Sequence, residues 1–491
     1  MISELIKVKP YDHQIKAAVF AIDIFTGKPL DGNIHYNGCA FLMEMGCGKT
    51  LASIIVAGYL FNKKLIDKVL IVCPLSITGV WEDEFKKFAN YEFKTHIIKG
   101  SSPVKKKKEL DQFLISYETR QNDYLQVVIV NYETSWRMLT ELITFNPDLI
   151  IADEGHKLKE NRSKQSQGMH KLGDLAKYKM LLTGTIITNK EIDIYSQYRF
   201  VDPQVFGTNF FAFRNRYLEM GGYQNHIPIF KEYLKPQFLE KMHSIAFRVT
   251  KAECLDLPEI IEEERYIELE DDAYKKYKTI EKDCYLELGD MEVNATNILT
   301  KMLRLSQAAG GFVTLENKEN PEHTTTKSIS TAKLDALNDI IDLTQNENKK
   351  IVIIARFIAE LDAIEELLKK KKINFAHIRG GVKDQTTEWQ RFQNDDTCTV
   401  FVGQIQAAGL GITLTKASTM VFYSLDYSMS NFEQCKARIH RSGQTEKCHY
   451  IYLIAKGTLD RKVLKALKNK DELARELVDE YRNGINPFSE E

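Results

Sequence analysis

The chain has 491 residues, of which 43% are hydrophobic and 27% charged, and its formal net charge is −1. This length allows two or three domains with ordinary globular cores, while the near-zero charge excludes any argument for nucleic-acid binding from overall basicity. A nucleic-acid surface on this chain must therefore be a local patch of positive charge.

The eight cysteines are scattered along the chain and include no C-x-x-C pair. This distribution argues against a disulfide framework and against a zinc ribbon, and it suits the reducing interior of a cell. No apolar run reaches membrane-spanning length, and the first residues do not resemble a signal peptide. We expect a cytoplasmic protein with no membrane partner.

The first 200 residues alternate short apolar runs with stretches of helical character. Strand-like runs occur at residues 39–43, 68–73, 127–130, 148–152 and 179–183. Continuous apolar runs that are separated by helices are typical of a parallel sheet covered on both faces. We therefore expect residues 1–200 to form a doubly wound α/β lobe.

The middle of the chain has a different pattern. Residues 201–320 are aromatic, charged and helical in character, and they predict a helical insertion. A polar stretch at 316–330 is typical of a loop. The aromatic and basic residues at 210–224 could stack on bases, but core packing within the insertion is the interpretation that we favour.

The apolar alternation resumes in the last third of the chain, with runs at 350–356, 373–378, 398–402, 418–424 and 448–454. These runs predict a second doubly wound sheet. The expected fold class is therefore α/β, with two parallel-sheet lobes and a helical insertion between them. We place the second lobe at 321–475 and a terminal helix or tail at 476–491.

The stretch "FLMEMGCGKT" predicts a strand, a tight glycine turn and the start of a helix. Gly46 and Gly48 would let backbone N–H groups converge on phosphate oxygens, and the helix N-terminus adds positive potential. Lys49 would contact the β and γ phosphates, and Thr50 would offer a hydroxyl to Mg²⁺. The strict P-loop pattern has glycine where this chain has Met43, so the stretch alone could be a glycine-rich strand–helix turn.

A second signal is the stretch "DEGHKLKEN", which follows an apolar strand-like run. Two adjacent carboxylates, Asp153 and Glu154, repel each other, so this strand end predicts a bound cation. Asp153 would hold Mg²⁺ and Glu154 would orient the attacking water. Both signals together predict a P-loop NTPase that binds ATP and Mg²⁺. Cys47, inside the cradle, is interpreted as a passive small residue rather than a reactive thiol.

The stretch "NFEQCKARIHRSGQ" can supply a cation to the γ-phosphate. Gln434, Arg438 and Arg441 are spaced i, i+4, i+7, so we expect them on one face of a helix. They follow a strand of the second sheet, where open α/β sheets bind ligands. We expect Arg438 and Arg441 to be catalytic, with plain surface charge as the alternative.

The preceding stretch "QAAGLGITLTKAS" adds a second place for a phosphate. Gly409 and Gly411 would let the backbone approach a phosphate closely, and Thr413 offers a hydroxyl to the same phosphate. An arginine finger raises the hydrolysis rate by a factor of roughly 10³–10⁵. Hydrolysis would then depend on closure of the lobes, which is how a motor couples chemistry to movement.

These motifs, in this order, resemble those of helicase superfamily 2, and within it those of the Swi/Snf-type ATPases. The resemblance covers about residues 8–470 and rests on "PYDHQ", "MEMGCGKT", "VLIVCPLSITGVWEDEF", "DEGHKLKEN", "LLTGTIITN", "GLGITLTKAS" and "QCKARIHRSGQ". It implies two RecA-like lobes in a compact bacterial or phage member of that family, inside the bacterial or phage-infected cell. It also implies ATP and Mg²⁺ as cofactors and duplex DNA as partner.

The resemblance also implies roles for residues outside the phosphate cradle. Gln14 would contact the adenine base. Coupling between the ATP state and movement would involve His156, Thr183, Thr185 and Gln434.

Contacts to the DNA backbone are expected at four further positions. The resemblance places Ser76 and Thr413 near the DNA. Arg356 and Arg379 lie at or near the ends of strands of the second lobe and are candidates for the same role.

The sequence leaves three functions open. The first is a DNA-dependent ATPase that translocates on duplex DNA and remodels DNA or protein–DNA complexes. The second is a strand-separating helicase of phage or plasmid replication, which needs a wedge element that the sequence does not reveal. The third is an ATP-switched module that recruits a protein partner, such as a nuclease or a replication factor.

Overall fold

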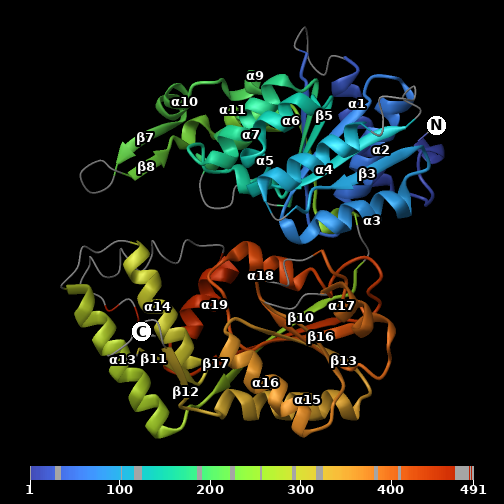
Figure 1. Ribbon diagram of the computed structural model, residues 1–491. Coiled ribbons are helices and arrows are strands. Elements are labelled where there is room, and N and C mark those ends of the chain that lie inside the picture. Colours follow the sequence, from blue (N-terminus) through green and yellow to red (C-terminus); the bar gives the residue numbers. More distant parts are fainter. Residues whose placement is uncertain are drawn as a thin grey trace. The chain divides into compact units, whose positions relative to one another are not determined.

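The computed structural model divides the chain into two compact units, Met1–Asp256 and Leu257–Glu491 (Figure 1). Among the residues that it describes, none of the helices combines the length and the apolar character of a membrane span. The described residues are 2–27, 35–100, 102–115, 124–184, 191–221, 227–254, 257–289, 295–316, 324–380, 385–406, 411–469, 486 and 488.

A sheet of seven parallel strands forms the centre of the first unit, in the spatial order β3-β4-β2-β5-β6-β1-β9. Every residue of β1, β5 and β6 is buried, as expected for a sheet that helices cover on both faces. The strand bounds are β1 Gly38–Met43, β2 Lys68–Cys73, β3 Phe93–Ile97, β4 Leu125–Asn131, β5 Leu149–Asp153, β6 Tyr178–Thr183 and β9 Ala246–Val249. The five predicted strands of this lobe are confirmed.

Helices and one antiparallel hairpin complete the first unit. The α-helices are α1 Asp12–Phe25, α2 Lys49–Asn62, α3 Thr78–Phe88, α4 Pro103–Ile115, α5 Tyr132–Arg137, α6 Leu139–Phe145, α7 Lys164–Leu175, α8 Asp193–Val201, α9 Pro203–Phe206, α10 Phe210–Tyr217, α11 Lys235–His243 and α12 Lys251–Cys254. The hairpin strands are β7 Leu218–Gly221 and β8 Ile227–Phe230, and the 3-10 helices are η1 Ile2–Glu4, η2 Leu75–Ile77, η3 Gly155–Leu158 and η5 Glu232–Leu234.

An aromatic cluster packs α9, α10 and α11 together with the hairpin. Phe213 and Tyr217 are each 2% exposed, and their rings contact Phe206 and Phe238. The core-packing interpretation is therefore correct for these two aromatic residues of the stretch 210–224.

A second sheet, of six parallel strands, forms the centre of the second unit in the order β10-β17-β16-β13-β15-β14. The strand bounds are β10 Ile260–Ile267, β13 Lys350–Ala355, β14 Phe375–Ile378, β15 Val400–Gln404, β16 Ala417–Phe422 and β17 Cys448–Ala455. The five predicted strands of the second lobe are confirmed, and the two doubly wound parallel sheets have the expected α/β fold class.

The helices of the second unit cover both faces of its sheet, since successive strand side chains point to opposite faces. Val352 and Ile354 pack with side chains of α13, α14, α17, α18 and α19. Ile351 and Ile353 pack with side chains of α15 and α16. The bounds are α13 Asp271–Gly289, α14 Ala295–Ala309, α15 Ala332–Asn346, α16 Ile358–Lys370, α17 Gln385–Asn394, α18 Met429–Lys436 and α19 Asp460–Asn469, with hairpin strands β11 Phe312–Glu316 and β12 Thr324–Ser328.

The middle segment differs from its expected form. Residues 201–320 contain strands as well as helices and fall in both units, because β9 pairs with β1 and β10 pairs with β17. The loop expected at 316–330 contains strand β12, where three consecutive β-branched threonines favour the extended backbone. Of the expected tail at 476–491, only Asn486 and Phe488 are described.

Candidate functional site

The glycine turn lies between the end of β1 and the start of α2. Gly46 has φ 92° and Gly48 has φ 80°, a left-handed backbone that glycine adopts without a side-chain clash. The first N–H groups of α2 have no carbonyl partner within the helix, so they are available to an anion at this turn. Lys49, the first residue of α2, donates from Nζ to the Met43 carbonyl at 2.9 Å, which holds its charge beside the turn.

The start of α1 is fastened to the same turn. His13 Nε2 lies 2.8 Å from the Cys47 carbonyl oxygen, and Gln14 Nε2 donates to that oxygen at 3.4 Å. The Gln14 side-chain oxygen accepts from Tyr11 N–H at 2.9 Å. A Cβ on Gly48 would lie only 2.0 Å from Gln14 Nε2, so a side chain at this position would displace the Gln14 amide. The structure thus brings Gln14 to the cradle, together with His13, which the sequence analysis missed.

The acidic strand end lies at the same edge of the sheet. β6 pairs with both β5 and β1, which brings Asp153, Thr183 and the glycine turn to neighbouring carboxyl ends. Asp153 is 7% exposed, and its carboxylate accepts from Trp81 Nε1 and from Glu154 N–H, each at 2.9 Å. Trp81 was not singled out from the sequence, although it lies within a motif that carried the resemblance.

The electrostatics of this strand end favour a nearby cation. Burial, and next the charge of Glu154, raise the pKa of Asp153 above its usual range, and Lys49 only partly opposes them. Glu154 has φ 53°, uncommon for a residue with a side chain, and its Oε2 lies 3.3 Å from His156 Nδ1. A strained backbone that aims a carboxylate is a feature of functional sites.

Thr50 and Asp153 fit the chemistry that Mg²⁺ needs. In nucleotide sites this ion keeps several waters and binds one or two protein oxygens together with phosphate oxygens. In the described part of the chain, no cluster of three or more His, Cys, Asp or Glu side chains could form a metal cage. The half-buried Thr50 in the first turn of α2 and the desolvated Asp153 are consistent with such a shared site.

The expectation that the motif arginines share one helix face is wrong. α18 ends at Lys436, so Arg438 and Arg441 lie in the turns that follow it. These turns fold back on the glycine-containing loop, because Leu414 N–H donates to the Arg438 carbonyl at 3.0 Å and Arg441 Nη1 donates to the Ile412 carbonyl at 3.3 Å.

A buried glutamine explains why the chain folds back. Gln444 is 7% exposed, and its Nε2 donates to the carbonyls of Ala417, Ile439 and Thr415 at 2.9, 3.2 and 3.3 Å. The same fold brings Gly411 and Thr413 beside the arginine turns. Gln434 remains on α18 and donates to Ser430 Oγ at 3.3 Å.

The two arginines proposed as DNA contacts already face carboxylates. Arg356 Nη2 lies 3.6 Å from Asp426 Oδ1, and the Arg356 guanidinium lies 4.0 Å from the centre of the Tyr427 ring. Arg379 pairs with Asp362, and its Nε lies 3.5 Å from Glu365 Oε1. These contacts reduce the positive charge that either side chain could offer to a phosphate.

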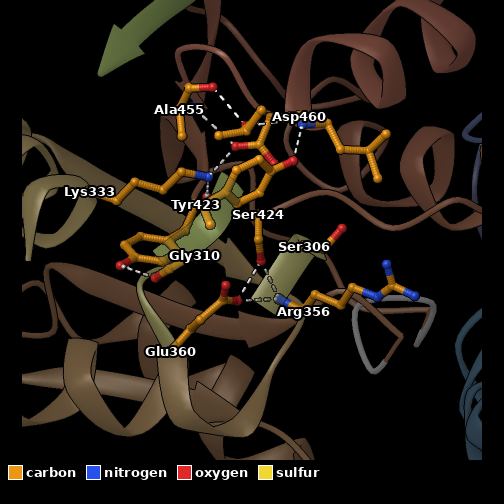
Figure 2. Close-up of polar contacts among 12 residues, drawn as sticks. Ser306, Gly310, Lys333, Arg356, Glu360, Tyr423, Ser424, Ala455 and Asp460 are labelled. Carbon is orange, nitrogen blue, oxygen red and sulfur yellow. Dashed lines mark hydrogen bonds and ion pairs between the residues drawn. The ribbon is translucent and has the colours of Figure 1, made fainter. Parts of the chain in front are cut away.

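A buried polar network, which the sequence analysis missed, joins several elements of the second unit (Figure 2). Lys333 is 2% exposed and donates from Nζ to Asp460 Oδ2 at 2.6 Å and to the Tyr423 carbonyl at 3.2 Å. Glu360 Oε2 accepts from Ser424 Oγ at 2.5 Å, and burial raises the pKa of Glu360 to about 7. The network therefore pairs Lys333 with Asp460 within the protein, while Glu360 keeps one buried oxygen, Oε1, without a hydrogen bond from any described residue.

Two of the expected site residues, Thr185 and Gly409, lie outside the described residues, and so does the side chain of Ser76. The backbone of Ser76 forms part of η2, directly before α3.

Comparisons with known proteins agree with the motif order. The family model of the SNF2-related domain matches residues 13–310, and that of the helicase conserved C-terminal domain matches residues 332–443. The DNA repair and recombination protein RAD54-like of Drosophila persimilis is 26% identical over 97% of this chain, and that of Danio rerio is also 26% identical over 97%. This chain spans 64% of the length of the first of these relatives and 68% of the second.

A solved structure, the Sulfolobus solfataricus SWI2/SNF2 ATPase core in complex with dsDNA, is 23% identical over 99% of this chain and 98% of that chain, with a TM-score of 0.43. The SNF2-related model alone spans more than half of the 491 residues. This chain therefore belongs to the SNF2-related family, with a helicase conserved C-terminal domain in its second unit.

Proposed function

We propose that this protein is a DNA-dependent ATPase that translocates on double-stranded DNA and remodels DNA or protein–DNA complexes. The observation that carries the proposal is the meeting of a glycine turn, Lys49 and the buried Asp153 at one edge of the first sheet. Membership of the SNF2-related family supports ATP as the nucleotide and DNA as the partner. The DNA repair and recombination proteins among its relatives support the same partner.

In this proposal, the first unit holds the nucleotide. The N–H groups around Gly46 and Gly48 and the Lys49 ammonium bind the phosphates, while Gln14 contacts the base. Mg²⁺, held by Thr50 and Asp153, would neutralise charge that develops on the β and γ phosphates.

In the same proposal, Glu154 orients the attacking water and accepts a proton from it, with its Oε2 3.3 Å from His156 Nδ1. We also assign Thr183, Thr185 and Gln434 to the coupling between ATP state and movement.

The second unit contributes positive charge in this proposal. Arg438 and Arg441 would stabilise the charge of the transferred phosphoryl group, as arginine fingers do. Thr413 and Ser76 would contact DNA phosphates, which position a protein without reading sequence. We give Arg356 and Arg379 less weight as DNA contacts, since both already face carboxylates. All eight cysteines are free thiols, which supports a reducing, cytoplasmic location. We place the protein in a bacterial or phage-infected cell on the motif resemblance alone.

The test pairs ATP turnover with two displacement substrates. Turnover is measured without DNA and with single-stranded, duplex and forked DNA. We expect duplex to stimulate most, and we expect ATP-dependent displacement of a triplex-forming strand while a forked duplex stays annealed. Glu154→Gln is the matched control that should bind DNA without displacing either strand.

Two results would overturn the proposal. Efficient unwinding of the fork with an untouched triplex would favour the strand-separating helicase. ATP binding without any DNA-stimulated turnover would favour a nucleotide-switched module that recruits a nuclease or replication factor.

A further inference from the structure

Two thiols meet at the phosphate cradle. Cys47 lies within the glycine turn and is fully buried, whereas Cys254 is half-buried at the end of α12. Their sulfur atoms are 3.4 Å apart, although 207 residues separate them in sequence. Neither thiol has a part in the proposed hydrolysis.

The contact is built into the first sheet rather than left to a free loop. β9 runs parallel to β1 and places Val249 beside Met43. The loop then holds the segment that follows β9, because Glu44 N–H donates to the Val249 carbonyl at 3.1 Å and the Glu44 carboxylate accepts from Lys251 N–H at 3.0 Å. These bonds fasten α12, and with it Cys254, against the glycine turn.

The distance suits a covalent bond between the two sulfurs. A disulfide requires a separation of about 2.05 Å, so the sulfurs must approach by about 1.3 Å. Rotation of the Cys254 side chain can supply much of this movement, because Cys254 is partly exposed whereas Cys47 is buried. The exposed part of Cys254 also gives a small oxidant access to the pair.

We propose that Cys47 and Cys254 form a dithiol modification site, in which a peroxide joins the two sulfurs and thereby switches off the nucleotide site. The deprotonated Cys254 sulfur attacks one peroxide oxygen, the O–O bond breaks, and sulfenic acid and one water form. The Cys47 sulfur then attacks that sulfur, the S–O bond breaks, the S–S bond forms and a second water leaves. The two thiols together lose two electrons, and one peroxide accepts them and is reduced to two waters.

The surroundings of the two thiols determine the rate of this oxidation. Burial raises the pKa of Cys47 to about 12 and also raises the pKa of Cys254, so thiolate is scarce at neutral pH. Because the thiolate is the reacting form, we expect oxidation to need peroxide in excess and to speed up as pH rises.

The effect on nucleotide binding rests on the proposed ATP site. A disulfide would tether Cys47, between Gly46 and Gly48, to α12. It would also strain the bonds that His13 and Gln14 make to the Cys47 carbonyl. N–H groups of the turn that must converge on the phosphates would then lose their alignment.

The experiment treats the 491-residue chain with excess hydrogen peroxide, blocks free thiols by alkylation and maps disulfides by mass spectrometry. Binding of a fluorescent ATP analogue and ATP turnover are measured before and after reduction with dithiothreitol. Cys254→Ser removes the exposed thiol, and Cys398→Ser removes a buried thiol of the second unit as the matched control.

We expect a 47–254 disulfide in wild type and in Cys398→Ser. Turnover should fall about 10²-fold, the scale that a displacement of about 1 Å costs a catalytic site, and dithiothreitol should restore it. Cys254→Ser should keep its turnover in peroxide. Absence of the 47–254 disulfide, or equal inactivation of Cys254→Ser, would overturn the inference. A reduced protein that neither binds nor hydrolyses ATP would instead refute the proposed function and the switch with it, while the disulfide map would still decide the thiol chemistry.

Discussion

The two units share one architecture, but the buried charged side chains at their strand ends have different partners. In the first, the buried Asp153 accepts from neutral donors, the Trp81 indole and a backbone N–H, and its pKa is raised. In the second, Lys333 and Asp460 form a buried ion pair, and Arg356 faces Asp426. A carboxylate held by neutral donors favours a cation brought by a ligand, whereas a paired carboxylate already has its counter-charge within the protein. The comparison therefore contrasts the candidate site of the first sheet with a network of paired charges on the second.

The largest expected effect tests whether the second unit also takes part in chemistry. Arg438→Ala and Arg441→Ala should each lower duplex-stimulated ATP turnover about 10³-fold while ATP affinity stays near normal, because an arginine finger acts on the transition state. Steady-state turnover and nucleotide binding measure the two effects. Lys447→Ala, at an exposed lysine of the same unit, is the control. If both arginine variants keep stimulated turnover, these arginines are surface charges.

Glu154→Gln tests whether the strand end of the first unit takes part in ATP hydrolysis. The variant should bind Mg·ATP and DNA, since Lys49 and Asp153 remain, but its turnover should fall about 10²–10⁴-fold, the range of general base catalysis. Glu160→Gln, which changes an exposed acid a few residues away, should behave as wild type. Loss of nucleotide binding by a folded Glu154→Gln protein would contradict the water-orienting role.

Lys333→Met tests whether the buried ion pair of the second unit contributes to stability. It leaves Asp460 buried without its cation, so we expect the unfolding free energy of the second unit to fall by about 3–5 kcal/mol. Urea denaturation followed by a probe in that unit measures the change. Adding Asp460→Asn should recover part of the loss, because the lone charge is gone. A fully stable Lys333→Met protein would show that the pair contributes nothing to the fold.

The pH dependence of stability tests the carboxyl in the same network. The pKa of Glu360 is about 7 in the fold against 4.5 ordinarily, so the folded state binds the proton more tightly. Its stabilising contribution is complete below about pH 4.5 and is lost as pH rises towards 7, by roughly 3 kcal/mol.

Glu360→Gln should remove this slope, and the wild type should be most stable relative to the variant near pH 5. Urea denaturation from pH 5 to 8 measures the difference. Glu366→Gln, at an exposed acid of the same helix, should follow the wild-type curve. Parallel curves for wild type and Glu360→Gln would show that Glu360 does not titrate in this range.

The sequence predicted most of the fold because the core strands carry a local signal. The runs in β1, β2, β5, β13 and β16 are apolar and nearly all buried. β10 was not predicted because half of its eight residues are charged and most are exposed, and β9 was not predicted because it has only four residues.

The sequence predicted the candidate site less completely than the fold. A helical spacing is valid only while the helix lasts, and α18 ends before Arg438. The pairs Lys333–Asp460 and Cys47–Cys254 join residues 127 and 207 positions apart, a separation at which no local pattern exists.

The most direct test of the account is ATP turnover with and without duplex DNA in wild type, Lys49→Ala and Lys63→Ala. Lys49 begins α2 beside the glycine turn, whereas Lys63 is an exposed lysine at the other end of that helix. The account predicts duplex-stimulated turnover in wild type and in Lys63→Ala and none in Lys49→Ala. Turnover by Lys49→Ala at the wild-type rate would contradict the placement of ATP chemistry in the first unit.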